Sequence, residues 1–165
     1  MATARPGWTF EGVDPARPML DLARRSLGNA ADRVAFVEGY IQDASEGRFD
    51  GAVCLLTMHF LDYEARVETA FEIRRRLKPN APFVMAHASF SQVLEARNYW
   101  LNRYAEFALA KGAPPEMVAM AKQGVRNQNT LLSPQQDEAA LLAAGFTGVE
   151  QFYAAFTWRG WVSYA

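Results

Sequence analysis

The segment GVDPARPMLDLARR, residues 12–25, joins the end of a predicted strand to a predicted helix. The strand covers residues 8–13 and places Asp14 directly at its carboxyl end. Pro15 disfavours helical backbone at Asp14 but suits the first turn of the helix, which apolar spacing places over residues 16–27. Ligands of parallel α/β sheets bind beyond the carboxyl ends of the strands, where a carboxylate can accept hydrogen bonds from two ribose hydroxyls. Asp14 is therefore either a ribose ligand or a cap on the following helix.

Short β-rich runs alternate with amphipathic stretches along the chain, which predicts βαβ units around a parallel sheet. The run over residues 51–57 is continuously apolar, so we expect a strand buried on both faces. A helix over residues 64–77 is expected to end in a solvated basic cluster at residues 74–78, which the helix dipole favours. The remaining elements are expected as strands at 34–38 and 82–87, helices at 92–110, 115–125 and 133–144 (with Ser133 as N-cap), and a hairpin of residues 149–157 and 161–164 turning at 158–160.

The composition argues against a membrane-spanning, secreted, disulfide-linked or metal-binding chain. The 165 residues suit one domain, 50% hydrophobic residues suit a packed core, and a net charge of -1 gives no electrostatic footprint for non-specific nucleic-acid binding. No apolar run is long enough to span a membrane, and the N-terminus lacks the apolar core of a signal peptide. The single Cys54 excludes an internal disulfide, and with only two histidines we expect no metal site. These features predict a single cytoplasmic domain over residues 1–165.

Five segments, in this order and spacing, resemble consecutive motifs of the class I S-adenosylmethionine-dependent methyltransferases. They are GVDPARPMLDLARR (12–25), RVAFVEGYIQD (33–43), RFDGAVCLLTMHFL (48–61), RRRLKPNAPFVMAHAS (74–89) and AGFTGVEQFYAAFTWRGWVSYA (144–165). The resemblance implies a Rossmann-like α/β sheet with a C-terminal antiparallel hairpin. Within that superfamily, the arrangement is most similar to the branch of carboxy-S-adenosylmethionine synthases and tRNA-uridine-modifying enzymes.

The resemblance also implies a set of cofactor-binding residues. Asp14 matches the acid that binds both ribose hydroxyls, and Met19 matches an apolar residue near the adenine. Tyr40 and Ile41 fall where the family places a polar and an apolar residue around the adenine ring, so stacking on Tyr40 could replace a hydrogen bond; Asp43 could supply a carboxylate instead. Leu55 lies where a family strand passes the methionine portion of S-adenosylmethionine.

Catalytic residues are less defined. His59 follows the strand over residues 51–57 at the mouth of the expected substrate site, where it is either a general base or, as we favour, a loop or helix-cap histidine. His87 carries the same ambiguity. Methyl transfer to a good nucleophile needs little beyond alignment of the two reactants.

The implied function is methyl transfer from S-adenosylmethionine to a small molecule or a tRNA base. A helical insertion over residues 89–128, rich in aromatics, is expected to cover the acceptor site. Its cations could contact an anionic substrate, although isolated surface charges are the simpler interpretation; a homodimer remains open. The alternatives are a non-catalytic relic or partner subunit that binds the cofactor poorly, and a nicotinamide-dependent dehydrogenase, which the predicted terminal hairpin disfavours.

One family feature has no counterpart. A nucleotide-binding βαβ unit places its glycine-rich loop roughly 20 residues before the ribose acid, whereas 13 residues precede Asp14. We therefore expect the first strand and the glycine-rich loop to be lacking. An N-terminally truncated sequence is the favoured explanation; direct pairing of the flanking strands and donation of a strand by another chain are the others.

Overall fold

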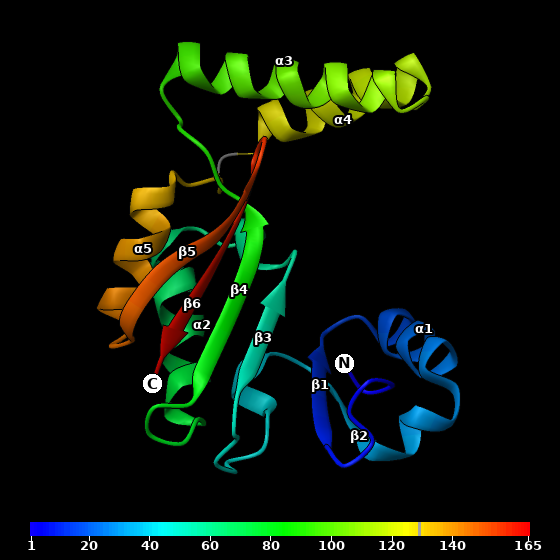
Figure 1. Cartoon of the computed structure of the whole chain (residues 1–165), viewed down its shortest axis with the longest axis vertical. Coiled ribbons are helices and arrows are strands. Elements are labelled where there is room, and N and C mark those ends of the chain that lie inside the picture. Colours follow the sequence, from blue (N-terminus) through cyan, green and yellow to red (C-terminus); the bar gives the residue numbers. More distant parts are fainter. Residues whose placement is uncertain (129) are drawn as a thin grey trace. The chain divides into compact units, whose positions relative to one another are not determined.

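The computed structural model describes residues 1–128 and 130–165, and the chain divides into two compact units, residues 1–47 and residues 48–165 (Figure 1). Each unit carries its own β-sheet, two-stranded in the first unit and four-stranded in the second. No helix among the described residues is long and apolar enough to span a bilayer.

The first unit is built on a parallel strand pair. β1 (Phe10–Asp14) pairs with β2 (Val34–Glu38), and the crossover between them contains α1 (Arg17–Leu27) and a short 3-10 helix (Gly28–Arg33). Because the register aligns Asp14 with Glu38, both strands end at the same edge. The predicted strand at 34–38 is therefore confirmed, as is the helix that follows Asp14.

Arg33 ties the N-terminal residues to this unit. Its Nη2 donates to Ala2 O at 2.6 Å, and its Nη1 donates to Arg5 O at 3.1 Å and to Trp8 O at 2.6 Å. One charged side chain thus satisfies three carbonyls, and Ala2 is buried beneath it at 7% exposure.

The second unit contains a mixed sheet in the order β3–β4–β6–β5. β3 (Ala52–Leu55) and β4 (Pro82–Ala88) are parallel, whereas β6 (Trp158–Tyr164) is antiparallel to both β4 and β5 (Thr147–Ala155). The predicted C-terminal hairpin is confirmed, but its turn lies at residues 156–157 rather than 158–160. Phe156 adopts a positive φ of 52° there, and Trp158 already pairs with Ala155.

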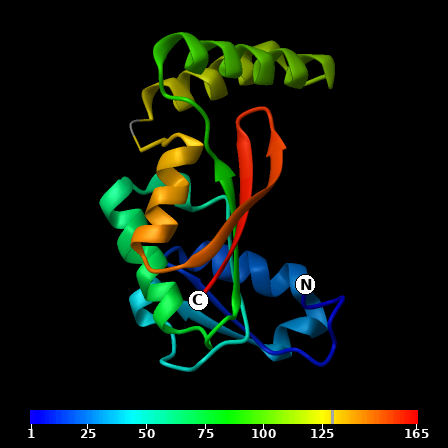
Figure 2. The same ribbon diagram turned by 60° about the vertical axis from the view of Figure 1, so that its left-hand side comes forward.

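Two helices cover one face of this sheet. α2 (Tyr63–Arg75) and α5 (Pro134–Ala143) lie side by side on the same face in Figures 1 and 2. Beneath them Phe83 stacks on Phe146 with ring centroids 5.2 Å apart, and Trp161 is fully buried. Ser133 caps α5, as the sequence predicts: its Oγ accepts a hydrogen bond from Gln136 N, and its own N donates to Gln136 Oε1.

The helical insertion forms an antiparallel pair, α3 (Leu94–Ala110) and α4 (Pro115–Asn127), beyond the carboxyl end of β4 (Figure 1). A small core anchors the pair to the sheet through Phe90, Leu101 and Leu131, with Trp158 packed against them. Burial of these side chains removes apolar surface from water and fixes α3 over the strand ends.

Two predictions about burial are wrong. The strand at 51–57 is not buried on both faces: β3 is an edge strand of its sheet, and Val53 and Leu55 on one face are 43% and 54% exposed. The basic cluster at the end of α2 is not uniformly solvated either. Arg76 is 2% exposed and pairs with Glu72, one turn earlier on the same helix, because the carboxylate compensates the buried charge.

Candidate functional site

Asp14 lies at the carboxyl edge of the first unit. Its Oδ1 accepts a hydrogen bond from Ala16 N at 2.8 Å, and its own carbonyl accepts one from Gly39 N at 3.2 Å. The side chain therefore supports the turn into α1. Among the described residues no hydrogen bond reaches Oδ2, so one carboxylate oxygen remains available to a ligand.

The loop after β2 passes the same edge. Tyr40 is 67% exposed, Ile41 is half-buried, and Met19 on α1 is 52% exposed. Asp43 folds back, and its Oδ2 accepts from Tyr40 N at 2.9 Å. Gly39 permits this with φ at 155°, because a Cβ there would lie 2.3 Å from that same oxygen. Asp43 is thus engaged in holding its own loop.

The second unit carries Leu55 and His59. Leu55 ends β3, and Leu56 follows in a left-handed conformation with φ at 61°, which is rare for a bulky side chain. Such strain is held in place by the surroundings, and here Leu56 N donates to Ala86 O at 2.7 Å. A short 3-10 helix (Met58–Phe60) then buries His59 to 8% exposure.

His59 sits in apolar and cationic surroundings. Burial, His87 and the Arg66 charge together lower its pKa from 6.5 to about 4, against the opposing charge of Asp137. Its ring meets Trp158 edge-on with centroids 6.0 Å apart, and Nδ1 has no hydrogen-bond partner among the described residues. His59 is therefore a neutral imidazole at pH 7.

A buried ionic cluster lies behind His59. Arg66 of α2 pairs with Asp137 of α5, and the two side chains are 1% and 0% exposed. Arg66 Nη2 also donates to Leu61 O at 2.8 Å and to Thr130 O at 2.9 Å. His87 Nε2 lies 3.1 Å from Asp137 Oδ1, outside the angular range of a directional hydrogen bond.

These charges set the ionisation of Asp137. Burial alone raises the pKa of its carboxyl group, but His87 and the Arg66 guanidinium outweigh burial and lower that pKa below 3.8. No sequence motif points to Arg66 or Asp137. They stand 71 positions apart, and only the packing of α2 on α5 brings them together.

A pocket of about 340 Å³ opens at the carboxyl ends of β3 and β4. Leu56 and Ala86 contribute from the strand ends, and Tyr104 contributes from α3. The hairpin adds Tyr153, Trp158 and Arg159, and His87 completes the lining. The pocket thus lies where parallel sheets bind ligands, and the predicted insertion supplies one of its walls. Leu55 precedes the lining residue Leu56, and the His59 ring lies 6.2 Å from the His87 ring and 6.0 Å from the Trp158 ring, measured between centroids.

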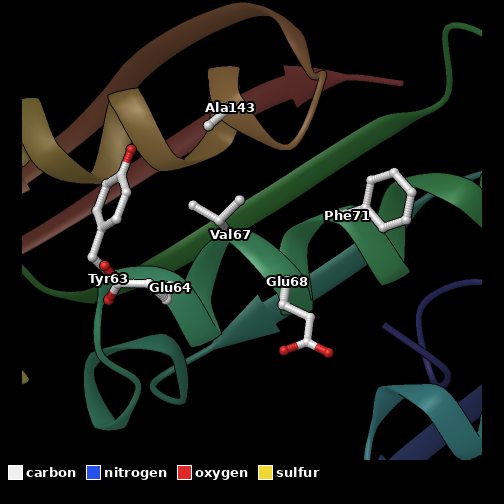
Figure 3. Close-up of a pocket in the computed structure, with 6 residues that line it drawn as sticks. All are labelled: Tyr63, Glu64, Val67, Glu68, Phe71 and Ala143. Carbon is white, nitrogen blue, oxygen red and sulfur yellow. The ribbon is translucent and has the colours of Figure 1, made fainter.

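A second concavity, of about 390 Å³, follows the outer side of α2 (Figure 3). Tyr63, Val67 and Phe71 form its apolar lining with Ala143 of α5, and Glu68 points away from them. It contains none of the predicted site residues. Within residues 1–128 and 130–165, no group of three or more His, Cys, Asp or Glu side chains could hold a metal ion.

Comparisons with known proteins bear on the fold. Residues 1–80 match a family model described as a methyltransferase domain. The carboxy-S-adenosyl-L-methionine synthase of Wolinella succinogenes is 23% identical over 154 residues, which are 93% of this chain and 62% of that protein. The chain therefore spans less than two thirds of the length of this relative.

Two solved structures share the architecture. A candidate O-methyltransferase from Nostoc punctiforme superposes with a TM-score of 0.71 at 15% identity, covering 99% of this chain and 47% of that one. Human N-acetylserotonin methyltransferase in complex with SAM superposes with a TM-score of 0.61 at 14% identity, covering 98% and 42%. These findings confirm the predicted resemblance: the chain has the Rossmann-like fold of the class I S-adenosylmethionine-dependent methyltransferases.

Proposed function

We propose that this chain transfers a methyl group from S-adenosylmethionine to a small-molecule acceptor. The match to a methyltransferase-domain model and the shared fold support the cofactor and the reaction class. The observation that carries the proposal is Asp14, a carboxylate at the edge where parallel strands bind nucleotides, with Oδ2 available.

The predicted residues of the first unit have defined tasks in this proposal. Asp14 accepts hydrogen bonds from the ribose, and the exposed Tyr40 ring offers a face to the adenine beside Ile41 and Met19. S-adenosylmethionine supplies an activated methyl group on a sulfonium, so the protein has chiefly to align the acceptor and exclude water.

His59 fits a packing role in this proposal better than that of a general base. A pKa of about 4 makes its imidazole a weak proton acceptor at neutral pH, whereas general bases work best near the operating pH. Its carbonyl accepts from Gln128 Nε2 and Thr130 Oγ1, both at 2.7 Å, which ties the 3-10 helix to the segment after α4.

The charge balance of the chain favours a small acceptor over tRNA. Arg97 donates to the carbonyls of Val125, Arg126 and Gln128. Lys122 and Arg126 donate to asparagine side chains across the α3–α4 pair. These acceptors are uncharged, so the contacts orient the side chains without neutralising them. The net charge of -1 is what gives a phosphate backbone no electrostatic footprint on this chain.

Titration calorimetry with S-adenosylhomocysteine tests the cofactor assignment. Asp14→Asn keeps an oxygen for the Ala16 cap but removes the charge, and Asp32→Ala is the control for loss of an exposed acid in the same unit. Because hydrogen bonds to charged groups contribute about 1.5–3 kcal/mol, we expect Asp14→Asn to weaken binding at least about tenfold and Asp32→Ala to leave it unchanged.

Absence of binding to the folded chain, or equal binding by Asp14→Asn, would overturn the assignment. The first outcome would favour the alternative of a non-catalytic relic or partner subunit. A gel shift of unmodified tRNA by the cofactor-loaded chain would instead favour a tRNA base as acceptor.

A further inference from the structure

The pocket at the carboxyl ends of β3 and β4 has aromatic walls. Tyr104 and Trp158 meet edge-to-face with ring centroids 6.5 Å apart, and Tyr153 stands on the neighbouring strand. Aromatic side chains in such a corner offer both ring faces and ring edges to a planar guest. The walls therefore favour a flat, unsaturated ring over a flexible aliphatic chain.

Small residues pack closely between the strands beside these rings. Ala86 pairs with Gly160 across the sheet, and Gly160 pairs in turn with Tyr153. A Cβ at position 160 would lie 3.2 Å from the Cβ of Tyr153 and 3.4 Å from that of Ala86, so the close packing there depends on glycine. Since a cavity of about 150 Å³ accommodates benzene, a pocket of about 340 Å³ takes one substituted ring.

Arg159 gives the pocket a positive charge. Its Nη1 donates to Phe156 O at 2.7 Å and to Trp158 O at 2.8 Å, and its guanidinium lies 5.6 Å from the centre of the Trp100 ring. These contacts hold the side chain in one place. No acidic side chain among the described residues forms an ion pair with it, and burial lowers its pKa without an opposing carboxylate.

An oriented, partly buried guanidinium without an anionic partner favours a carboxylate, which it can bind through paired N–H groups. We propose that this pocket binds a planar aromatic carboxylate, with the ring between Tyr104, Tyr153 and Trp158 and the carboxylate on Arg159. The identification of this ligand as the methyl acceptor rests on the proposed function. Binding of the ligand is independent of the proposed function, because every residue that lines the pocket belongs to the second unit.

The test uses the full chain and three probes, titrated by calorimetry without cofactor. 4-Hydroxybenzoate has the ring and the charge, 4-hydroxybenzamide has the ring alone, and cyclohexanecarboxylate has the charge alone. We expect 4-hydroxybenzoate to bind at least about tenfold more tightly than either of the others. Equal binding of all three, or no binding of any, would overturn the proposal.

Variants separate the two recognition elements. Arg159→Met is expected to abolish the preference for benzoate over benzamide, and Tyr153→Ala to weaken both aromatic probes about tenfold. Arg103→Met is the matched control, because Arg103 is exposed on α3 beside Tyr99 and does not line the pocket. If circular dichroism shows that Arg159→Met is unfolded, the Tyr153→Ala variant and the comparison of the three probes still test whether the pocket binds an aromatic carboxylate.

The outcomes for ligand and cofactor are distinguishable. Binding of 4-hydroxybenzoate without binding of S-adenosylhomocysteine would support the pocket and reject the methyltransferase function. Binding of S-adenosylhomocysteine with no discrimination among the probes would reject the aromatic carboxylate and leave the cofactor assignment intact.

Discussion

Replacement of Asp137 by asparagine is expected to destabilise the second unit strongly. The substitution keeps the size of the side chain but removes the negative charge that faces Arg66, and the two groups are 0% and 1% exposed. Loss of one partner from a buried ion pair costs about 3–5 kcal/mol because the other charge remains desolvated. Arg66 Nη2 retains the Leu61 and Thr130 carbonyls, which places the expected loss near the lower end, at about 3 kcal/mol.

Urea denaturation followed by tryptophan fluorescence measures this loss, with Asp50→Asn as the control. Asp50 pairs with Lys78 at 2.6 Å, but the two side chains are 89% and 51% exposed. Exposed pairs contribute about 0–1 kcal/mol, so the control isolates the effect of burial. A loss below about 1 kcal/mol for Asp137→Asn would refute the reasoning, because it would show that Arg66 finds solvation elsewhere.

The same pair predicts a pH dependence. The pKa of Asp137 is lower in the folded chain than in the unfolded one, so its contribution is fully present above about pH 4. That contribution is lost as the pH falls through the folded pKa. The asparagine variant lacks this contribution, so its free energy of unfolding should depend less on pH below about pH 4 than that of the wild type.

Two further substitutions follow from the site geometry. Because the pKa of His59 is lowered to about 4, its contribution to the free energy of unfolding is fully present above pH 6.5 and is lost as the pH falls towards 4. The pKa shift corresponds to about 3 kcal/mol, which solvent screening reduces to about 1–2 kcal/mol. His59→Phe should remove this pH dependence, which urea titrations at several pH values measure. A slope equal to wild type would show that other groups cause it. Gly39→Ala should destabilise the first unit by about 1–3 kcal/mol, because a φ of 155° is strained for alanine and the new Cβ would displace Asp43. Gly7→Ala is the control, because a Cβ at position 7 meets no atom within 4 Å. Equal thermal midpoints for the two variants would contradict the proposed strain at position 39.

The elements that could be predicted from the sequence are those governed by local rules. Ser133 and Gln136 form the capping box, and the strand over residues 34–38 has the predicted bounds. Asp14 stands at a strand end because a proline follows it. Each of these features depends on residues within about four positions of one another, where periodicity and capping chemistry act directly.

The burial errors have a different origin. A continuous apolar run such as residues 51–57 indicates a strand, but only the sheet order decides whether both of its faces are covered. The burial of Arg76 likewise follows from how α2 packs, although Glu72 at the i−4 position is a sequence signal that could have indicated its partner.

The charged groups of the second unit could not be predicted because they meet through tertiary packing. Arg66, His87 and Asp137 come from α2, β4 and α5, and no spacing rule relates them. Arg159 had one signal in the sequence, since it is the sole cation in the aromatic stretch of the terminal hairpin. That it lacks an acidic partner among the described residues, and that it lines a pocket, depend on the tertiary structure.

The proposed cofactor and acceptor contacts are carried by different units, and this allows them to be measured independently. Asp14 is held by hydrogen bonds to Ala16 and Gly39, both within residues 1–47, whereas Arg159 is held by the hairpin in residues 48–165. Substitutions that share no partner usually have additive effects. Asp14→Asn should therefore leave the affinity for 4-hydroxybenzoate unchanged, and Arg159→Met should leave that for S-adenosylhomocysteine unchanged. Loss of both affinities from either substitution would show that the variant is unfolded, not that a binding contact was removed.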